Sequence, residues 1–71
     1  MEATMKKLGS SNAWTLYFGG GEFSLSNRST GEVLTAYGTY ENGGESYSVD
    51  HGPTQHEVDL IAEVLDLIHA D

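Results

Sequence analysis

The residues best suited to chemistry lie in the segment DHGPTQHE, at positions 50–57. His51 and His56 stand there among carboxylates, and imidazole with carboxylate is an acceptable donor set for zinc. A metal-dependent enzyme acting through this pair is therefore one hypothesis. The spacing matches no helical metal motif, because a Gly-Pro break separates His51 from His56 in the first turn of a predicted helix. We therefore expect His56 and Glu57 to face solvent, with no metal and no cofactor.

Other forms of catalysis have less support. The serines fall in predicted turns or on outward strand faces, and no Gly-x-Ser-x-Gly elbow occurs. A phosphate-binding reading of the glycines at positions 19–21 fails, because the Lys and Ser/Thr of a P-loop are missing and no helix follows. A pair of catalytic carboxylates needs a cleft, which a small sheet with one helix hardly provides. We expect a protein that is not an enzyme.

Charge is the most informative feature of the composition. The chain of 71 residues carries 11 acids against 3 Lys and Arg, a formal net charge of −8. Residues 29–71 contain nine acids and no Lys or Arg. Such a field argues against direct binding to nucleic acid or to an anionic membrane, and it favours a basic protein surface as partner. The alternative is that the charge serves only solubility.

The acids follow a pattern within this field. Asp59, Glu63 and Asp66 lie on one face of a predicted helix, and like charges at such spacings cost ~0.2–0.5 kcal/mol per pair. Their spacing of ~4.5–6 Å along the axis could imitate a phosphate backbone before a basic surface. Acids of the last predicted hairpin would extend this acidic surface: Glu41, Glu45 and Asp50. The stripe is either a working surface or a solvated one.

The elements that must position these acids can be read from periodicity. Alternating or β-rich runs predict strands at about 13–18, 22–27, 32–40 and 45–50, separated by Gly- and Asn-rich turns. Residues 54–70 predict one helix, and residues 1–12 predict a loose N-terminal segment. Short turns favour an antiparallel meander whose apolar face the helix covers. We therefore expect a single α+β domain at 13–71, a four-stranded antiparallel meander followed by one C-terminal helix.

The predicted helix has its own start signal and two apolar rows. Thr54 and Glu57 have the spacing of a capping box. The main row is expected to meet the sheet: Val58, Ile61, Ala62, Leu65 and Ile68. Its partners on the sheet are expected to be Trp14, Leu16, Phe18, Phe23, Leu25 and Val49, with Leu34 and Ala36 also in the core. The second row either meets a curved sheet or forms a homodimer contact, as in a small structural or adaptor protein: Leu60, Val64 and Leu67.

Two further features bear on location and partners. Cysteine is absent, which fits a reducing compartment, and the residues LGSSNA after Lys6 and Lys7 are not those of a secretory signal. We expect a cytoplasmic protein without a membrane span. Any tyrosine that faces outward would suit a protein interface, and the sequence does not say which do: Tyr17, Tyr37, Tyr40 and Tyr47.

In size, acidity, lack of cysteine and predicted meander-plus-helix build, the chain resembles small phage-encoded inhibitors, of which anti-CRISPR proteins are the best-known group. The resemblance is to the class and carries over no residue. It implies a protein that occludes the nucleic-acid site of a host complex by imitating DNA. We expect a non-enzymatic inhibitor whose acidic surface binds a Lys/Arg-rich site, such as that of a CRISPR effector.

Overall fold

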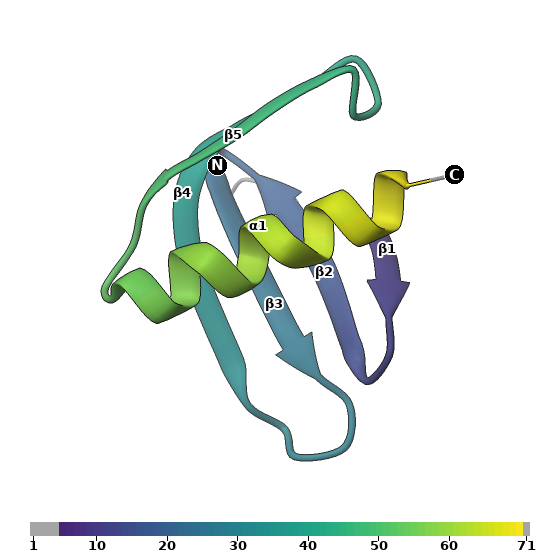
Figure 1. The fold of residues 1–71 in the computed structure, drawn as a ribbon, viewed down its shortest axis with the longest axis vertical. Helices are drawn as coiled ribbons and strands as arrows, with labels where there is room; N and C mark the ends of the chain where they lie inside the picture. Colours follow the sequence, from purple (N-terminus) through teal and green to yellow (C-terminus); the bar gives the residue numbers. More distant parts are fainter. Residues whose placement is uncertain (1–4, 71) are drawn as a thin grey trace.

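Within residues 5–70, five strands form one antiparallel sheet, and a single helix lies across one of its faces (Figure 1). The computed structural model describes residues 5–70. Each strand pairs with the next along the chain, so the sheet order follows the sequence. The α+β class with a C-terminal helix is confirmed, but the meander has five strands rather than four. The elements are β1 (Lys6–Ser11), β2 (Trp14–Gly19), β3 (Glu22–Asn27), β4 (Val33–Glu41), β5 (Ser46–His51) and α1 (Gln55–His69).

The additional strand, β1, lies where the sequence predicts a loose segment. Its residues KKLGSS lack a clean alternation, and the pairing with β2 shifts register between Lys7 and Gly9. Backbone hydrogen bonds to β2 do not depend on side-chain pattern, so a weakly patterned segment can still form an edge strand. The helix secures β1, because a Cβ on Gly9 would lie 2.9 Å from Ile68 Cγ2. Residues 1–4 of the predicted loose segment lie outside the described part.

Tight turns connect the strands as their sequences predict. Gly19 pairs with Glu22, which leaves Gly20 and Gly21 as the turn between β2 and β3, with φ of 60° and 80°. Positive φ at both central positions gives the twist that adjacent antiparallel strands require. Asn42 begins the β4–β5 turn, also at positive φ. The four predicted strands match the observed β2–β5 to within one residue at each end.

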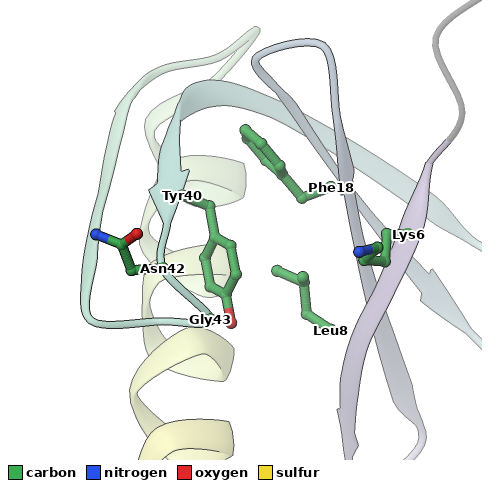
Figure 2. Close-up of a pocket in the computed structure, with 6 residues that line it drawn as sticks. All are labelled: Lys6, Leu8, Phe18, Tyr40, Asn42 and Gly43. Carbon is green, nitrogen blue, oxygen red and sulfur yellow. The ribbon is translucent and has the colours of Figure 1, made fainter.

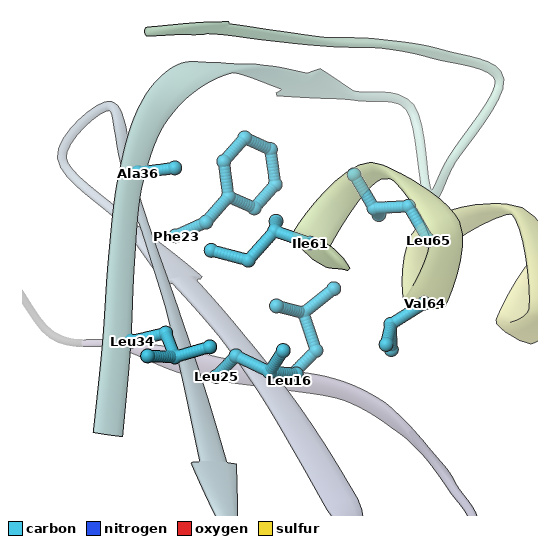
Figure 3. Close-up of a cluster of buried hydrophobic side chains, with 8 residues drawn as sticks. All are labelled: Leu16, Phe23, Leu25, Leu34, Ala36, Ile61, Val64 and Leu65. Atoms are coloured by element: carbon cyan, nitrogen blue, oxygen red, sulfur yellow. The ribbon is translucent and has the colours of Figure 1, made fainter. Parts of the chain in front are cut away.

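The core lies between α1 and the inward residues of the three central strands (Figure 3). The predicted inward faces of β2 and β3 are confirmed, and so is the prediction that β4 turns Leu34 and Ala36 inward. Fully burying side chains of this size contributes ~1.5–3 kcal/mol each, which makes this cluster the main source of stability. The buried residues are Leu16, Phe23, Leu25, Leu34, Ala36, Ile61, Val64 and Leu65.

A bulge in β5 directs the last hairpin toward the helix, because Asp50 has no partner on β4 between the pair of Tyr37 with His51 and the pair of Gly38 with Val49. The pairing of β4 with β5 shifts register between Tyr37 and Gly38. Only glycine fits here, because a Cβ on Gly38 would lie 1.9 Å from the Ser48 carbonyl oxygen. Beyond the bulge, β4 and β5 run to the C-terminal end of α1, where Gly44 lies against His69 (Figure 1). A bulge that bends its strand explains how β5 reaches the helix.

The helix starts at the predicted capping box, with one difference in its bonding. The Glu57 N–H donates to Thr54 Oγ1 at 3.3 Å, as expected of the cap. The Glu57 carboxylate does not reach back to the backbone of Thr54. Its Oε1 accepts from the Thr54 hydroxyl at 3.0 Å, and its Oε2 accepts from the Thr35 N–H of β4 at 3.4 Å. Pairing between β4 and β5 ends at Tyr37, and Thr35 lies beyond that end. The Glu57 carboxylate therefore accepts the hydrogen bond of the Thr35 N–H at the open edge of the sheet.

The helix spans Gln55–His69, within one residue of the prediction at each end. No helix in the described part of the chain combines the length and the hydropathy needed to cross a bilayer.

Candidate functional site

The three acids of the predicted helix stripe are all exposed on α1. Asp59 Oδ1 accepts a hydrogen bond from Gln55 Nε2 at 2.8 Å, one turn earlier in the helix. Asp66 Oδ1 accepts from the hydroxyl of Tyr47, on β5, at 2.9 Å. Glu63 lies between them. α1 contains no Lys or Arg that could offset this negative charge.

The three acids of the predicted hairpin are exposed as well. Glu41 ends β4 and pairs in register with Ser46, while Glu45 lies in the turn. Asp50 lies near the other end of β5, where its Oδ1 accepts from Ser48 Oγ at 2.8 Å. The acids of the hairpin therefore span the length of β5 rather than one point on it.

The fold brings the tip of the hairpin and the last turn of the helix together. A Cβ on Gly44 would lie 2.2 Å from His69 Cε1, so the turn packs directly on the end of α1. Glu45 follows Gly44, and Asp66 is tied to β5 one turn before His69. Asp50 lies at the far end of β5, away from this junction. The six predicted acids thus lie on α1 and on the β4–β5 hairpin. Glu45 and Asp66 lie near the helix C-terminus, whereas Glu41 follows Tyr40 and therefore lies on the outer face of the sheet.

The predicted homodimer contact does not form one surface. Val64 is only 2% exposed and belongs to the core, and Leu60 is partly buried against that core. Leu67 alone is well exposed, at 49%. The helix contacts both edge strands, β1 and β5, as well as β2 and β4. Of the two readings of the second apolar row, the structure therefore favours a sheet that wraps around the helix.

The two histidines of the segment DHGPTQHE have different surroundings. His51 ends β5 and stacks on Tyr37 of the outer sheet face, with ring centroids 5.2 Å apart. His56 is exposed in the first turn of α1. Within residues 5–70, no three His, Asp or Glu side chains gather closely enough to hold a metal ion.

His69 joins an aromatic group that the sequence does not reveal. Its Nε2 shares a hydrogen bond of 2.8 Å with the Tyr40 hydroxyl, and its ring stacks on Tyr47 at 5.4 Å. Tyr40 and Tyr47 also stack on each other, at 6.1 Å. His69 is partly buried at the end of the helix. Of the four tyrosines, Tyr37 is the exposed one, whereas Tyr40 and Tyr47 line this junction.

The carboxylate of Asp66 affects the acidity of its partner. The hydrogen bond to Asp66 raises the pKa of Tyr47 above its ordinary value near 10, with smaller contributions from desolvation and from the negative charge of Asp66. Tyr47 therefore stays protonated as a donor to Asp66 throughout the physiological range. This bond holds one acid of the stripe in a fixed position.

A cavity of about 360 Å³ opens where β1 approaches the β4–β5 turn (Figure 2). Leu8 and Tyr40 face each other from opposite walls, Phe18 lies between them, and Lys6 lies on the β1 side. The sequence missed this cavity because β1 was expected to be loose, and without β1 one wall does not exist. The lining residues are Lys6, Leu8, Phe18, Tyr40, Asn42 and Gly43.

The site therefore offers exposed carboxylates on a rigid helix and on the hairpin beside it. Such carboxylates can accept charge-assisted hydrogen bonds from Lys and Arg of a partner protein. Comparisons with protein-family models, with curated proteins and with solved structures find no match to this chain.

Proposed function

We propose that this protein is a non-catalytic inhibitor whose acidic surface occupies a basic, nucleic-acid-binding site on another protein. The surface consists of the exposed acids of α1 and of the β4–β5 hairpin: Asp59, Glu63, Asp66, Glu41, Glu45 and Asp50. Its partner is a Lys/Arg-rich protein surface such as that of a CRISPR effector, and its action follows from exclusion of DNA. The lack of cysteine supports action in a reducing cytoplasm.

The observation that carries the proposal is the exposed row of carboxylates on α1. Negative charge near the C-terminus of a helix opposes the helix dipole, and like charges three or four residues apart repel. A small domain has little stability to spare, so a pattern that opposes local preference supports a functional surface. The Tyr47 hydroxyl gives Asp66 a fixed position, which favours binding because less freedom is lost on association.

Charge segregation adds a second line of support. Lys6 and Lys7 lie on β1, and Arg28 lies in the turn after β3, where it donates to the Asn12 carbonyl. These three residues thus lie on other elements than the acids of the proposed surface, and only Lys6 approaches that surface, across the cavity from Asn42 and Gly43 of the β4–β5 turn. A one-signed surface steers association with a partner of opposite charge and raises the association rate at low salt.

The test measures DNA binding by a panel of purified CRISPR effector complexes in the presence of the protein, with fluorescence anisotropy of a labelled target duplex. We expect the wild type to compete with DNA for at least one effector, more weakly as salt rises. Exposed ion pairs contribute ~0.2–1 kcal/mol each, so a variant with Asp59→Asn, Glu63→Gln and Asp66→Asn should compete about tenfold less well. Asn at position 66 keeps an acceptor for Tyr47.

The matched control neutralises acids elsewhere. Glu22→Gln with Glu32→Gln removes charge from the start of β3, which pairs with Tyr37 in the middle of β4, and from the loop before β4, at the opposite end of that strand from the hairpin turn. We expect this variant to compete as well as the wild type to within about threefold, because distant exposed charges are screened. Equal losses in both variants, competition unaffected by salt, or no competition with any effector would each contradict the proposal.

A further inference from the structure

The cavity beside β1 has a chemical character that differs from the rest of this acidic chain. Its lining is apolar and aromatic on three sides, through Leu8, Phe18 and the ring of Tyr40. The ring centroids of Phe18 and Tyr40 are 5.9 Å apart and tilted by 43°. Among the described lining residues, Lys6 is the one charged group and no Asp or Glu is present. The cavity thus combines a flat apolar interior with a single positive charge.

The fold places Lys6 in this cavity through the register of β1. Lys6 pairs with Phe18, and directly opposed residues of an antiparallel pair lie on the same face of the sheet. Lys7 pairs with Tyr17 and therefore lies on the opposite, outer face. Two adjacent lysines of the same strand thus lie on opposite faces of the sheet. Only one of them lies beside the cavity.

The opposite wall carries a neutral polar side chain. Asn42 has a carboxamide with two N–H donors, and it stands at the start of the turn with φ of 56°. The Tyr40 hydroxyl is already engaged by His69, so Tyr40 presents its ring to the cavity (Figure 2). Glu41 belongs to the other face of β4, because side chains alternate along the strand. The wall opposite Lys6 is therefore neutral, with no carboxylate among the described lining residues.

From this geometry we propose that the cavity binds a small aromatic carboxylate. Its ring system packs against Leu8, Phe18 and Tyr40, and its carboxylate accepts hydrogen bonds from Lys6. A volume of about 360 Å³ lies within the range of small-molecule sites, which is ~300–1,000 Å³, and suits a ligand of one or two fused rings. At physiological salt the Debye length is ~8 Å, so distant acids of the chain are screened while Lys6 acts at contact.

The experiment titrates the ¹⁵N-labelled full chain with 2-naphthoate and follows the backbone amide signals by NMR. We expect concentration-dependent shifts at Leu8, Phe18, Asn42 and Gly43, with saturation in the millimolar range or below. The neutral analogue 2-naphthamide keeps the rings and lacks the charge. It should bind about fivefold more weakly, the fold-change that corresponds to one exposed ion pair.

The two lysines provide a matched pair of variants. Lys6→Gln should weaken binding of 2-naphthoate about fivefold and should leave binding of 2-naphthamide unchanged. Lys7→Gln removes the same charge from the outer face, and its affinity for 2-naphthoate should stay within about twofold of the wild type. Both side chains are exposed, so we expect each variant to fold as the wild type does. A dispersed amide spectrum verifies that it is folded.

Three results would overturn the proposal. The first is an absence of shifts up to millimolar 2-naphthoate, and the second is a set of shifts centred on residues away from the cavity. The third is equal weakening by Lys6→Gln and Lys7→Gln, which would show that the ligand responds to general charge and not to this site.

Discussion

The two ends of α1 are held by different kinds of contact. At the N-terminus, the Thr54 hydroxyl accepts from the Glu57 N–H, a contact between residues three positions apart. At the C-terminus, the bonds come from Tyr47 to Asp66 and from Tyr40 to His69, residues 19 and 29 positions apart. The first end is therefore held mainly by local contacts. Its one tertiary contact is the hydrogen bond from the Thr35 N–H to the Glu57 carboxylate. The second end has a local bond from the Ala70 N–H to the Leu67 carbonyl, but its side-chain bonds form only when the hairpin is folded against it.

This difference explains why an acid can stand near the unfavourable end of the helix. Carboxylates near a helix C-terminus are opposed by the dipole, and Asp66 has that position. The hydroxyl of Tyr47 donates to this carboxylate and offsets part of the opposition. The N-terminal acid, Glu57, needs no such help because its end of the helix favours negative charge. The position of an acid near the C-terminus thus depends on the sheet.

The largest expected effect comes from forcing the hairpin away from the C-terminal end. Gly44 has φ of +101°, and a Cβ there would displace the ring of His69. We expect Gly44→Ala to lower the free energy of unfolding by about 2 kcal/mol, through backbone strain and overpacking together. Gly43→Ala is the control, because its φ is +68° and nothing lies within 4 Å of its added Cβ. It should cost about 1 kcal/mol, from strain alone. Urea denaturation measures both, and equal losses would refute the packing of the turn on His69.

At the N-terminal end, Thr54→Ala removes both the acceptor for the Glu57 N–H and the donor to the Glu57 carboxylate. Loss of such a cap should lower the free energy of unfolding by about 1 kcal/mol. Thr54→Ser keeps the hydroxyl and should stay within about 0.5 kcal/mol of the wild type. Thermal unfolding followed by circular dichroism measures these differences. A Ser variant as unstable as the Ala variant would contradict the role of the hydroxyl.

The counterpart at the C-terminal end is Tyr40→Phe, which removes the hydroxyl bonded to His69 and keeps the ring. We expect a loss of about 0.5–1 kcal/mol, the net contribution of one partly buried hydrogen bond. Tyr37→Phe, on the outer face, should be near neutral. Because α1 is about 22 Å long, Thr54→Ala and Tyr40→Phe should be additive to within about 0.5 kcal/mol in a double-mutant cycle. A larger coupling energy would show that the two ends are not independent.

The smallest effect is a dependence of stability on pH. The folded-state pKa of Tyr47 is raised above its unfolded value near 10, so the folded state holds this proton more tightly. The corresponding stability is present below pH 10 and decreases as pH rises through the folded-state pKa. Tyr47→Phe should remove that part of the decrease in stability at alkaline pH. Asp66→Asn should lower the pKa of Tyr47 toward its ordinary value. Chemical unfolding between pH 9 and about 11.5, with NMR titration of Tyr47, measures both. A Tyr47 pKa unchanged in Asp66→Asn would exclude the hydrogen bond as the cause.

The sequence predicted more of the fold than of the site. The alternation in β2 and β3, the glycine turn between them and the helix with its cap all follow from local pattern, and they are confirmed. β1 was missed because KKLGSS forms a strand through backbone bonds to β2 and contact with α1, neither of which leaves a periodic signal. The candidate acids could be named from charge and spacing alone. Their arrangement around β5 could not.

By itself, the sequence determined where each central element begins and ends, which faces of the sheet and helix are apolar, and that the acids lack basic neighbours. These properties depend on neighbouring residues and on periodicity, so the local sequence determines them. The tertiary structure decided that Val64 is buried and therefore lost to any dimer contact, that Tyr47 holds Asp66, and that Lys6 borders a cavity. Each of these depends on the curvature of the sheet and the reach of β1 and β5 to the helix, which arise from contacts between distant residues.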